Sequence, residues 1–243
     1  GVLTTRGGTR FRYGPWRSDP SLRQIYPLPG GPDINEEAVI EATGLLAARG
    51  FDSVLTPALG TAEQVPFLNA GYRVCQVLQL LEIGLTRAME APPPEPGLRI
   101  RPARRRDMRP ILELDAAAFD AFWRFDAEAL AEAAHATPRN RRRVAQRDGR
   151  VVGYTMTGRS GRTGFVQRLA VDPDHHGRGT GRVLLVDSLS WLQRSGATRA
   201  LVNTQPGNDQ ALALYRSAGF NQRPEGLAVL RLDRDKNSGG DHL

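Results

Sequence analysis

The sequence is poor in cysteine, in lysine and in long apolar runs. Its single cysteine, Cys75, excludes an internal disulfide, and no positively charged segment leads into an apolar stretch at the start, so nothing indicates secretion. No apolar run approaches the roughly 18 residues that a membrane-spanning helix needs. With 40% hydrophobic and 24% charged residues, the composition is that of an ordinary globular protein. We expect a cytoplasmic protein without a membrane partner.

The positive charge is almost entirely arginine. The net charge is +7, and Lys236 is the sole lysine. Two clusters, Arg104 to Arg106 and Arg141 to Arg143, have the composition of a phosphate-binding patch. One-sided use of arginine is also typical of a coding bias, and a charge run is usually a solvated face. Nucleic-acid binding is therefore kept as an alternative, and nucleic acid is not an expected partner.

A proline-rich stretch, residues 91–97, separates the chain into two parts. Four of its seven residues are proline, a composition typical of an extended, semi-rigid spacer. The tail, residues 234–243, is polar and contains glycine, so we expect it to be disordered. The segments before and after the spacer, 1–90 and 98–233, are the candidate domains.

The second part alternates between strand and helix patterns. An Asp-Gly pair at Asp148 and Gly149, between apolar segments, predicts a hairpin. Apolar residues at helical spacing predict helices over 108–119, 127–135, 183–194 and 210–217. Short apolar runs predict strands over 98–101, 144–146, 151–157, 165–171, 199–204 and 227–232.

The loop from Asp172 to Arg182 is the segment richest in chemical information. It places three alternating glycines, Gly177, Gly179 and Gly181, between a predicted strand and a predicted helix. Glycine allows a sharp turn and a close approach to a ligand, and the unpaired N–H groups of a helix start attract anions. The loop is neither a Walker loop nor a dinucleotide fingerprint. It predicts a phosphate site.

The surroundings of the loop resemble the GNAT superfamily of N-acetyltransferases. The resemblance rests on Leu169-Ala170-Val171-Asp172-Pro173, on the loop, and on Asn208 to Phe220, and it covers roughly residues 98–233. The family pattern is Gln or Arg, two residues, Gly, one residue, then Gly or Ala. Here it reads His176-Gly177-Arg178-Gly179-Thr180-Gly181, so His176 departs from the family pattern.

This resemblance implies a fold. It is the acyl-CoA N-acyltransferase fold, an α/β (α+β) architecture with a mixed, mostly antiparallel twisted sheet flanked by helices. The subgroup that the sequence most resembles is the N-terminal acetyltransferases of ribosomal-protein alanine. Residues 98–233 are thereby expected to be the catalytic domain.

The resemblance also implies the site residues, with acetyl-CoA as the cosubstrate. One strand end pairs through its backbone with the pantetheine arm like an added strand: Leu169, Ala170 and Val171. The loop and helix start hold the pyrophosphate: Gly177, Arg178, Gly179, Thr180, Gly181 and Arg182. Asn208 contacts the cofactor arm, and Tyr215 protonates the departing thiolate. The alternative for Tyr215 is a core aromatic residue before a helix cap.

A general base is missing from the pattern. The subgroup has a Glu five residues before the Asn, and that position is Asn203 here, whose amide cannot act as a base. Candidates on the expected substrate side are Asp120, Glu128, Glu132 and His135, each of which is otherwise solvated surface. The adjacent His175 and His176 lack further ligands at suitable spacing, so no metal is expected.

The first part contains a weak internal echo of the second. Val54 to Tyr72 aligns without a gap on Val202 to Phe220, pairing Phe67 with Tyr215, and both copies end in Ala-Gly-aromatic. No glycine loop precedes the first copy, so no phosphate site is expected there. We interpret residues 1–90 as a degenerate, partial GNAT-like domain. Chance similarity is the alternative.

The leading interpretation is an acetyl-CoA-dependent N-acetyltransferase, an acyltransferase that acts by direct attack of a primary amine. The amine belongs to a peptide N-terminus, a lysine or a small molecule, and the region 119–140 shapes its pocket. The alternative is a non-catalytic acyl-CoA-binding regulatory module. The sequence leaves the acceptor, the base and the oligomeric state open.

Overall fold

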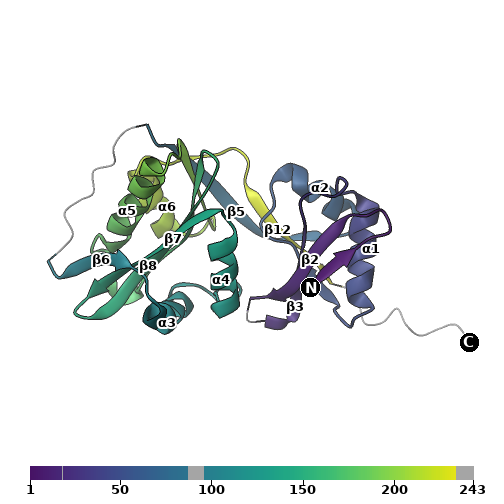
Figure 1. Ribbon diagram of the computed structural model, residues 1–243, viewed down its shortest axis with the longest axis horizontal. Helices are drawn as coiled ribbons and strands as arrows, with labels where there is room; N and C mark the ends of the chain where they lie inside the picture. Colours follow the sequence, from purple (N-terminus) through teal and green to yellow (C-terminus); the bar gives the residue numbers. More distant parts are fainter. Residues whose placement is uncertain (18, 87–95, 234–243) are drawn as a thin grey trace, which may run out of the picture. The chain divides into compact units, whose positions relative to one another are not determined.

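The computed structural model describes residues 1–17, 19–86 and 96–233. The chain forms two compact units (Figure 1). The first comprises Gly1–Gln79 together with the segment from Pro224 onward, and the second comprises Leu80–Arg223. Within the described ranges, no helix is long and apolar enough to cross a membrane.

The first unit is a sheet covered by two helices. The strand order is β1-β2-β3-β4-β12-β5, in which β3 and β4 are parallel. Its core includes the fully buried Phe11, Ile25, Val39 and Leu46. The strands are β1 (Val2–Thr4), β2 (Arg10–Trp16), β3 (Asp19–Pro27), β4 (Ser53–Leu55), β5 (Arg73–Gly84) and β12 (Leu227–Asp233). The helices are α1 (Glu36–Ala47) and α2 (Thr61–Asn69).

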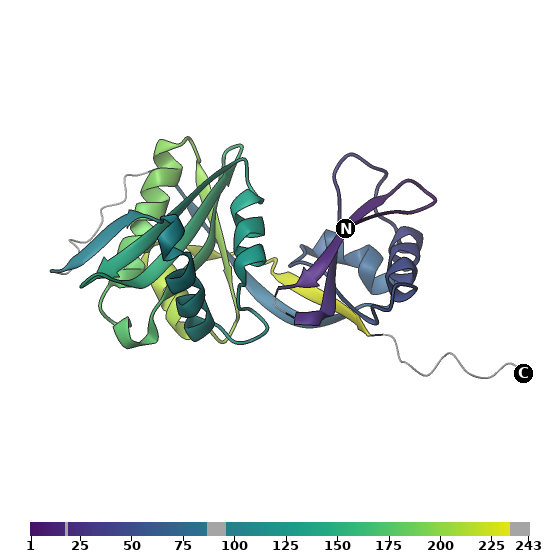
Figure 2. The same cartoon turned by 60° about the horizontal axis from the view of Figure 1, so that its bottom comes forward.

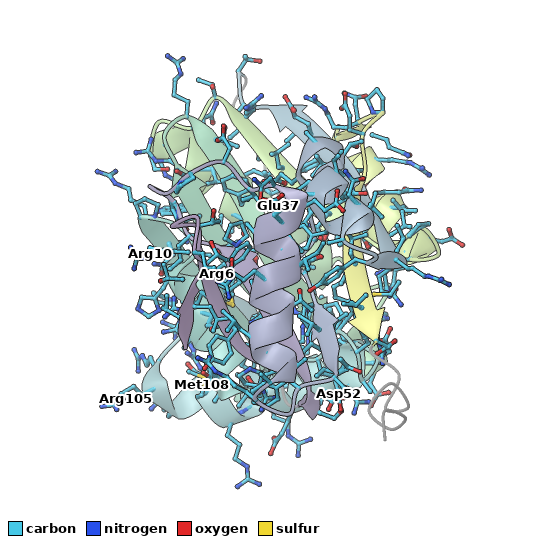
Figure 3. The ribbon with its side chains drawn as sticks, turned by 90° about the vertical axis from the view of Figure 1, so that its right-hand side faces the viewer. Arg6, Arg10, Glu37, Asp52, Arg105 and Met108 are labelled. Carbon is cyan, nitrogen blue, oxygen red and sulfur yellow. The ribbon has the colours of Figure 1, made fainter. Side chains whose placement is uncertain are left out.

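Helix α1 caps its own N-terminus. The side chain of Asn35 accepts the N–H of Ala38 at 2.9 Å, which satisfies one of the free donors of the first turn. Glu36 and Glu37 follow in that turn, and Figure 3 labels Glu37 at the start of the helix. Carboxylates stabilise a helix N-terminus because they complement its positive dipole end.

The second unit is a mixed, mostly antiparallel sheet between two helix layers. The order is β5-β10-β9-β8-β7-β6, β11 pairs with β5, and β9 and β10 are parallel. The strands are β6 (Leu98–Pro102), β7 (Arg139–Arg147), β8 (Arg150–Ser160), β9 (Thr163–Val171), β10 (Arg199–Thr204) and β11 (Asn221–Gln222). The α-helices are α3 (Met108–Ala118), α4 (Ala127–His135), α5 (Thr180–Arg194) and α6 (Asp209–Ser217).

The helices of the second unit cover both faces of its sheet (Figure 2). Helices α3 and α4 bury their apolar faces with Val144, Tyr154 and Met156. Helix α5 packs on the opposite face, where α6 joins it against Val166 and Val202. The predicted fold class is confirmed, and so is the hairpin, in which Asp148 and Gly149 adopt φ of 48° and 80° between β7 and β8.

The first unit contains one strand from a remote part of the chain, and β5 passes from the first unit into the second. Strand β12 lies between β4 and β5 in the first unit. The residues of β5 from Leu80 onward belong to the second unit, beside β10 and β11, and Leu85 N–H donates to the carbonyl of Thr198 at 2.8 Å. The unit boundaries therefore differ from the predicted domains, which ended at 90 and 233. Residues 91–95 of the predicted spacer and the predicted tail, 234–243, lie outside the described residues.

The two units share the same order of strands and helices along the chain. In the first it is β3, α1, β4, α2 and β5, and in the second it is β9, α5, β10, α6 and β11. The ring centroids of Phe67 and Tyr72 lie 5.3 Å apart, and those of Tyr215 and Phe220 lie 5.7 Å apart. In both pairs the N–H of the second residue donates to the carbonyl of the first at 3.0 Å. These pairs occupy matching positions of the internal alignment.

Candidate active site

Strands β9 and β10 diverge along their length. They pair only where Thr163 to Phe165 meets Arg199 to Leu201, and no further ladder between them is present in the described residues. The β8–β9 register shifts between Met156 and Thr157, which leaves Gln167 as an extra residue in β9. A bulge of this kind bends a strand and increases its twist. The edge of Leu169 to Val171 that faces away from β8 is therefore open to another extended chain.

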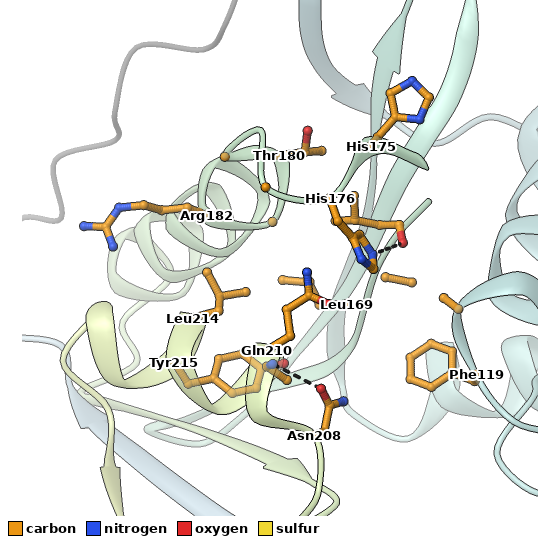
Figure 4. A pocket seen from close by; sticks show the side chains of 17 residues that line it. Phe119, Leu169, His175, His176, Thr180, Arg182, Asn208, Gln210, Leu214 and Tyr215 are labelled. Carbon is orange, nitrogen blue, oxygen red and sulfur yellow. Dashed lines mark hydrogen bonds between the residues drawn. The ribbon is translucent and has the colours of Figure 1, made fainter. Parts of the chain in front are cut away.

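A cavity of about 240 Å³ lies at this divergence (Figure 4). All the predicted site residues line it except Arg178, which is exposed on the loop and whose role stays a prediction. The structure thus brings together the strand end, the glycine loop, Asn208 and Tyr215. The sequence reasoning did not assign the remaining lining residues to the cofactor site: Ala118, Phe119, His175, His176, Gln210, Ala211 and Leu214.

The glycines of the loop have two different physical roles. Gly177 and Gly179 adopt φ of 73° and 74°, a conformation that strains a residue with a side chain. At Gly181 a Cβ atom would lie 3.3 Å from Leu214 Cδ2, so this glycine allows α5 to pack closely against α6. The first two glycines turn the chain, and the third sets the spacing of the helices.

Helix α5 begins at Thr180, three residues before the predicted start at 183. Its N-cap, Gly179, offers no side chain, and the first turn holds no acidic residue. The N–H groups of the first turn are therefore free to bind an anion, and the helix dipole favours one. The Oγ1 atom of Thr180 is buried and has no hydrogen-bond partner among the described residues. This arrangement fits the pyrophosphate of a coenzyme.

His176, the departure from the family pattern, anchors the loop. Its Nε2 lies 2.9 Å from the carbonyl oxygen of Val171, to which it donates because a carbonyl can only accept. The contact joins the loop to the end of β9. A side chain that ties the loop to the strand preserves the backbone geometry on which anion binding depends.

Asn208 and Tyr215 come from the start and the end of α6. The Oδ1 of Asn208 caps the helix by accepting the N–H of Ala211 at 3.1 Å, which leaves its NH₂ group for another partner. Tyr215 is only 5% exposed, and burial raises its pKa to about 12, against the field of Arg168, which lowers it. Its hydroxyl has no hydrogen-bond partner among the described residues. At neutral pH it is a protonated donor on the cavity wall.

None of the four base candidates lines the cavity. Asp120 lies next to the lining residue Phe119, where its carboxylate accepts the N–H of Trp123 at 3.2 Å and the amide of Gln205 at 3.4 Å. Glu128 and His135 are exposed on α4. No carboxylate is present among the described lining residues.

Two further expectations concern metals and arginines. Among the described residues, no group of three or more His, Cys, Asp or Glu side chains could hold a metal ion.

Arg141 and Arg143 both pair with Asp187 on α5, the latter through Nε at 3.2 Å. Because Asp187 neutralises part of its charge, this cluster is a weaker phosphate-binding surface than its sequence suggests.

Comparison with known proteins bears on the second unit most directly. The model of the acetyltransferase (GNAT) family matches residues 108–220, which contain every predicted site residue. N-alpha-acetyltransferase RimI of Mycobacterium tuberculosis is 43% identical over 91 residues, 36% of this chain and 56% of that protein. Mycothiol acetyltransferase of Pseudarthrobacter chlorophenolicus is 29% identical over 191 residues, 72% of this chain and 59% of that protein.

A similarity of fold extends over most of the chain. A tandem GNAT protein from the clavulanic acid biosynthesis pathway superposes with a TM-score of 0.69 at 13% identity, covering 94% of this chain and 81% of that one. At this identity the likeness concerns the fold alone. The matched segments cover less than two thirds of both curated relatives.

Proposed function

Because residues 108–220 form a GNAT acetyltransferase family domain, as its loop and strand motifs predicted, we propose that the chain transfers an acetyl group from acetyl-CoA to a primary amine. The proposal rests on one observation. The open edge of β9, the uncapped start of α5, Asn208 and Tyr215 all line the same cavity. Bound acetyl-CoA would supply the acetyl group as a thioester. The open strand edge would hold its amide-bearing arm, and the start of α5 its pyrophosphate.

Tyr215 would protonate the leaving group. Direct attack joins the amine nitrogen to the thioester carbon and breaks the carbon–sulfur bond, so the sulfur leaves as a thiolate. A tyrosine that is protonated at neutral pH and has no competing acceptor can give its proton to that sulfur. The proton that the nitrogen sheds can restore the hydroxyl, so no covalent enzyme intermediate is needed.

The acceptor amine would lose its first proton to solvent. No carboxylate lines the described cavity, and its two histidines, His175 and His176, belong to the loop before α5, where His176 is held by the carbonyl of Val171. We therefore place no protein base beside the attacking nitrogen. The rate would then depend on the fraction of acceptor that arrives as the free amine. We expect kcat/KM for the acceptor to rise with pH until the pH passes the pKa of the acceptor's own amine.

The first unit would be a copy without a cofactor site. The helix equivalent to α5 is α1, whose start is capped by Asn35 and carries Glu36 and Glu37. Pro29 and Pro32, in the loop before it, lack the N–H groups that an anion needs. An acidic, capped helix start opposes a pyrophosphate, so we expect one acetyl-CoA per chain.

Calorimetry with acetyl-CoA and a turnover assay test the proposal. We expect a single binding site per chain and release of free thiol with at least one member of a panel of peptides, lysine peptides, polyamines and amino sugars. Absence of binding would refute the proposal. Binding without turnover on the whole panel would favour the non-catalytic acyl-CoA-binding module, the second candidate, which the lack of a lining carboxylate supports.

A further inference from the structure

A buried ion pair joins α3 to β9 beside the cavity. Asp115 has no exposed surface, and Arg168 is 8% exposed. The guanidinium donates to both carboxylate oxygens, Nε to Oδ2 and Nη2 to Oδ1, at 2.8 Å each. The hydroxyl of Tyr154 donates to the same carboxylate. Burying two charges carries a large desolvation penalty, so such a pair is weak support for stability alone.

The same pair holds the segment between α3 and α4. Phe125 N–H donates to Asp115 Oδ1 at 2.7 Å, and Arg168 Nη2 donates to the carbonyl of Trp123 at 2.8 Å. The guanidinium carbon lies 3.4 Å from the ring centroid of Phe119 and 4.0 Å from that of Phe125. Two backbone contacts and two ring contacts thus hold residues 119–126 against α3 and β9.

Phe119 is the point at which this segment meets the cavity. Figure 4 shows its ring on the side opposite Tyr215, with Asn208 between them at the bottom of the view. The helix start that fits the pyrophosphate is contributed by other residues, at Gly177 to Arg182. The Phe119 wall is therefore the part of the cavity left for the acceptor.

We propose that Asp115 and Arg168 are positioning residues that fix Phe119 and the segment 119–126 as the acceptor-side wall of the cavity. The inference rests on the proposed acetyl transfer. It assigns the two residues a role in acceptor recognition that the cofactor residues do not share. The guanidinium of Arg168 also lies against the Phe119 ring, and the carboxylate of Asp115 balances its charge.

The matched control is the Arg101–Asp107 pair of the same unit. It too is buried, with two bonds between guanidinium and carboxylate, at 2.6 and 2.8 Å, and one backbone N–H on the carboxylate, from Arg104 at 2.7 Å. Neither Arg101 nor Asp107 lines the cavity. Asp107→Asn therefore perturbs a comparable pair without touching the proposed acceptor wall.

The experiment compares Asp115→Asn, Asp107→Asn and Phe119→Ala in the full chain. We expect Asp115→Asn to lower kcat/KM for the acceptor on the order of tenfold to a hundredfold, because small displacements of a reacting group have effects of this size. Affinity for acetyl-CoA should stay within about twofold, as recognition of the coenzyme uses other residues. Phe119→Ala should reproduce the acceptor effect even where Asp115→Asn folds poorly. Asp107→Asn should leave both constants unchanged.

Amide hydrogen exchange supplies a readout that does not need turnover. We expect faster exchange over residues 119–126 in Asp115→Asn and not in Asp107→Asn. Unchanged exchange there, or equal losses of acceptor kcat/KM in both Asn variants, would overturn the inference. Lack of turnover by the unsubstituted protein would instead defeat the proposed function.

Discussion

Removing the end of strand β5 should unfold the second unit. We compare two fragments, residues 80–223 and residues 98–223. The second lacks residues 80–97, which include Leu80 to Gly84 of β5 and the adjoining Leu85. Leu81, Ile83 and Leu85 are 0%, 8% and 5% exposed and belong to the core that contains Tyr215 and Phe220. The shorter fragment begins at the predicted boundary of the catalytic domain.

The expected loss in the free energy of unfolding is as large as the whole stability of a typical domain. Truncating one buried Leu or Ile to Ala costs about 2–5 kcal/mol, so losing three such side chains costs roughly 6–15 kcal/mol. Native domains are stable by only about 5–15 kcal/mol. The deletion also removes the strand to which β11 pairs, at Asn221 and Gln222. The 98–223 fragment should therefore have no net stability.

Thermal and urea unfolding followed by circular dichroism would measure the difference. We expect a cooperative transition for 80–223 and none for 98–223. A 98–223 fragment that melts cooperatively within a few degrees of 80–223 would show that the end of β5 is dispensable. In the full chain, Leu81→Ala should lower the free energy of unfolding by about 2–5 kcal/mol, with the transition still present.

Three other predictions follow from single contacts. Tyr215→Phe should lower kcat on the order of a hundredfold, because a proton donor contributes about 10²–10⁴-fold, and leave acetyl-CoA affinity unchanged in calorimetry; unchanged turnover would remove it from the mechanism. His176→Ala should weaken acetyl-CoA binding by loosening the loop from Val171, while His176→Gln, which can still donate, should restore it; equal affinities for both variants would exclude the anchor. Arg101 lowers the pKa of Asp107 from the ordinary value of 3.8 to about 2. This carboxylate therefore stabilises the fold fully above about pH 4, and its contribution decreases as the pH falls toward 2. Urea unfolding should show Asp107→Asn losing about 2 kcal/mol at pH 6 and approaching the unsubstituted protein near pH 2; a constant difference would contradict the assignment.

The residues of the candidate site could be grouped from the sequence because their signals are local. Three alternating glycines between a strand and a helix, then an Asn and a Tyr around the next helix, are short patterns, and the structure places them on one cavity. The start of α5 was missed because Gly179 ends the loop in a left-handed conformation and makes Thr180 the first helical residue. Helical spacing of apolar residues does not report such a start.

The Asp115–Arg168 pair was missed although a signal existed. Asp115 follows Leu114 and lies four residues after Ile111, and thus shares the apolar face of α3 with Ile111. A carboxylate on an apolar face calls for a buried partner, but the pattern does not say which arginine supplies it. With the arginines so numerous in this chain, the partner could not be chosen from the sequence.

The place of β12 in the first unit could not be derived from periodicity. Residues 227–232 show a strand pattern, and their neighbours in sequence favour a place in the second domain. Strand pairing depends on which strand edges in the sheets remain unpaired, and this is a property of the assembled fold. Local patterns predicted the strand correctly and left its partners, β4 and β5, undetermined.

The position of β12 also sets an order of events during synthesis. The first unit leaves the ribosome before the second, yet its sheet keeps a gap between β4 and β5 until the last strand has been made. Val229 and Leu230, both fully buried, fill that gap. The segment that is translated first is therefore completed last, and the second unit, which ends at Arg223, has all its strands before the first unit does.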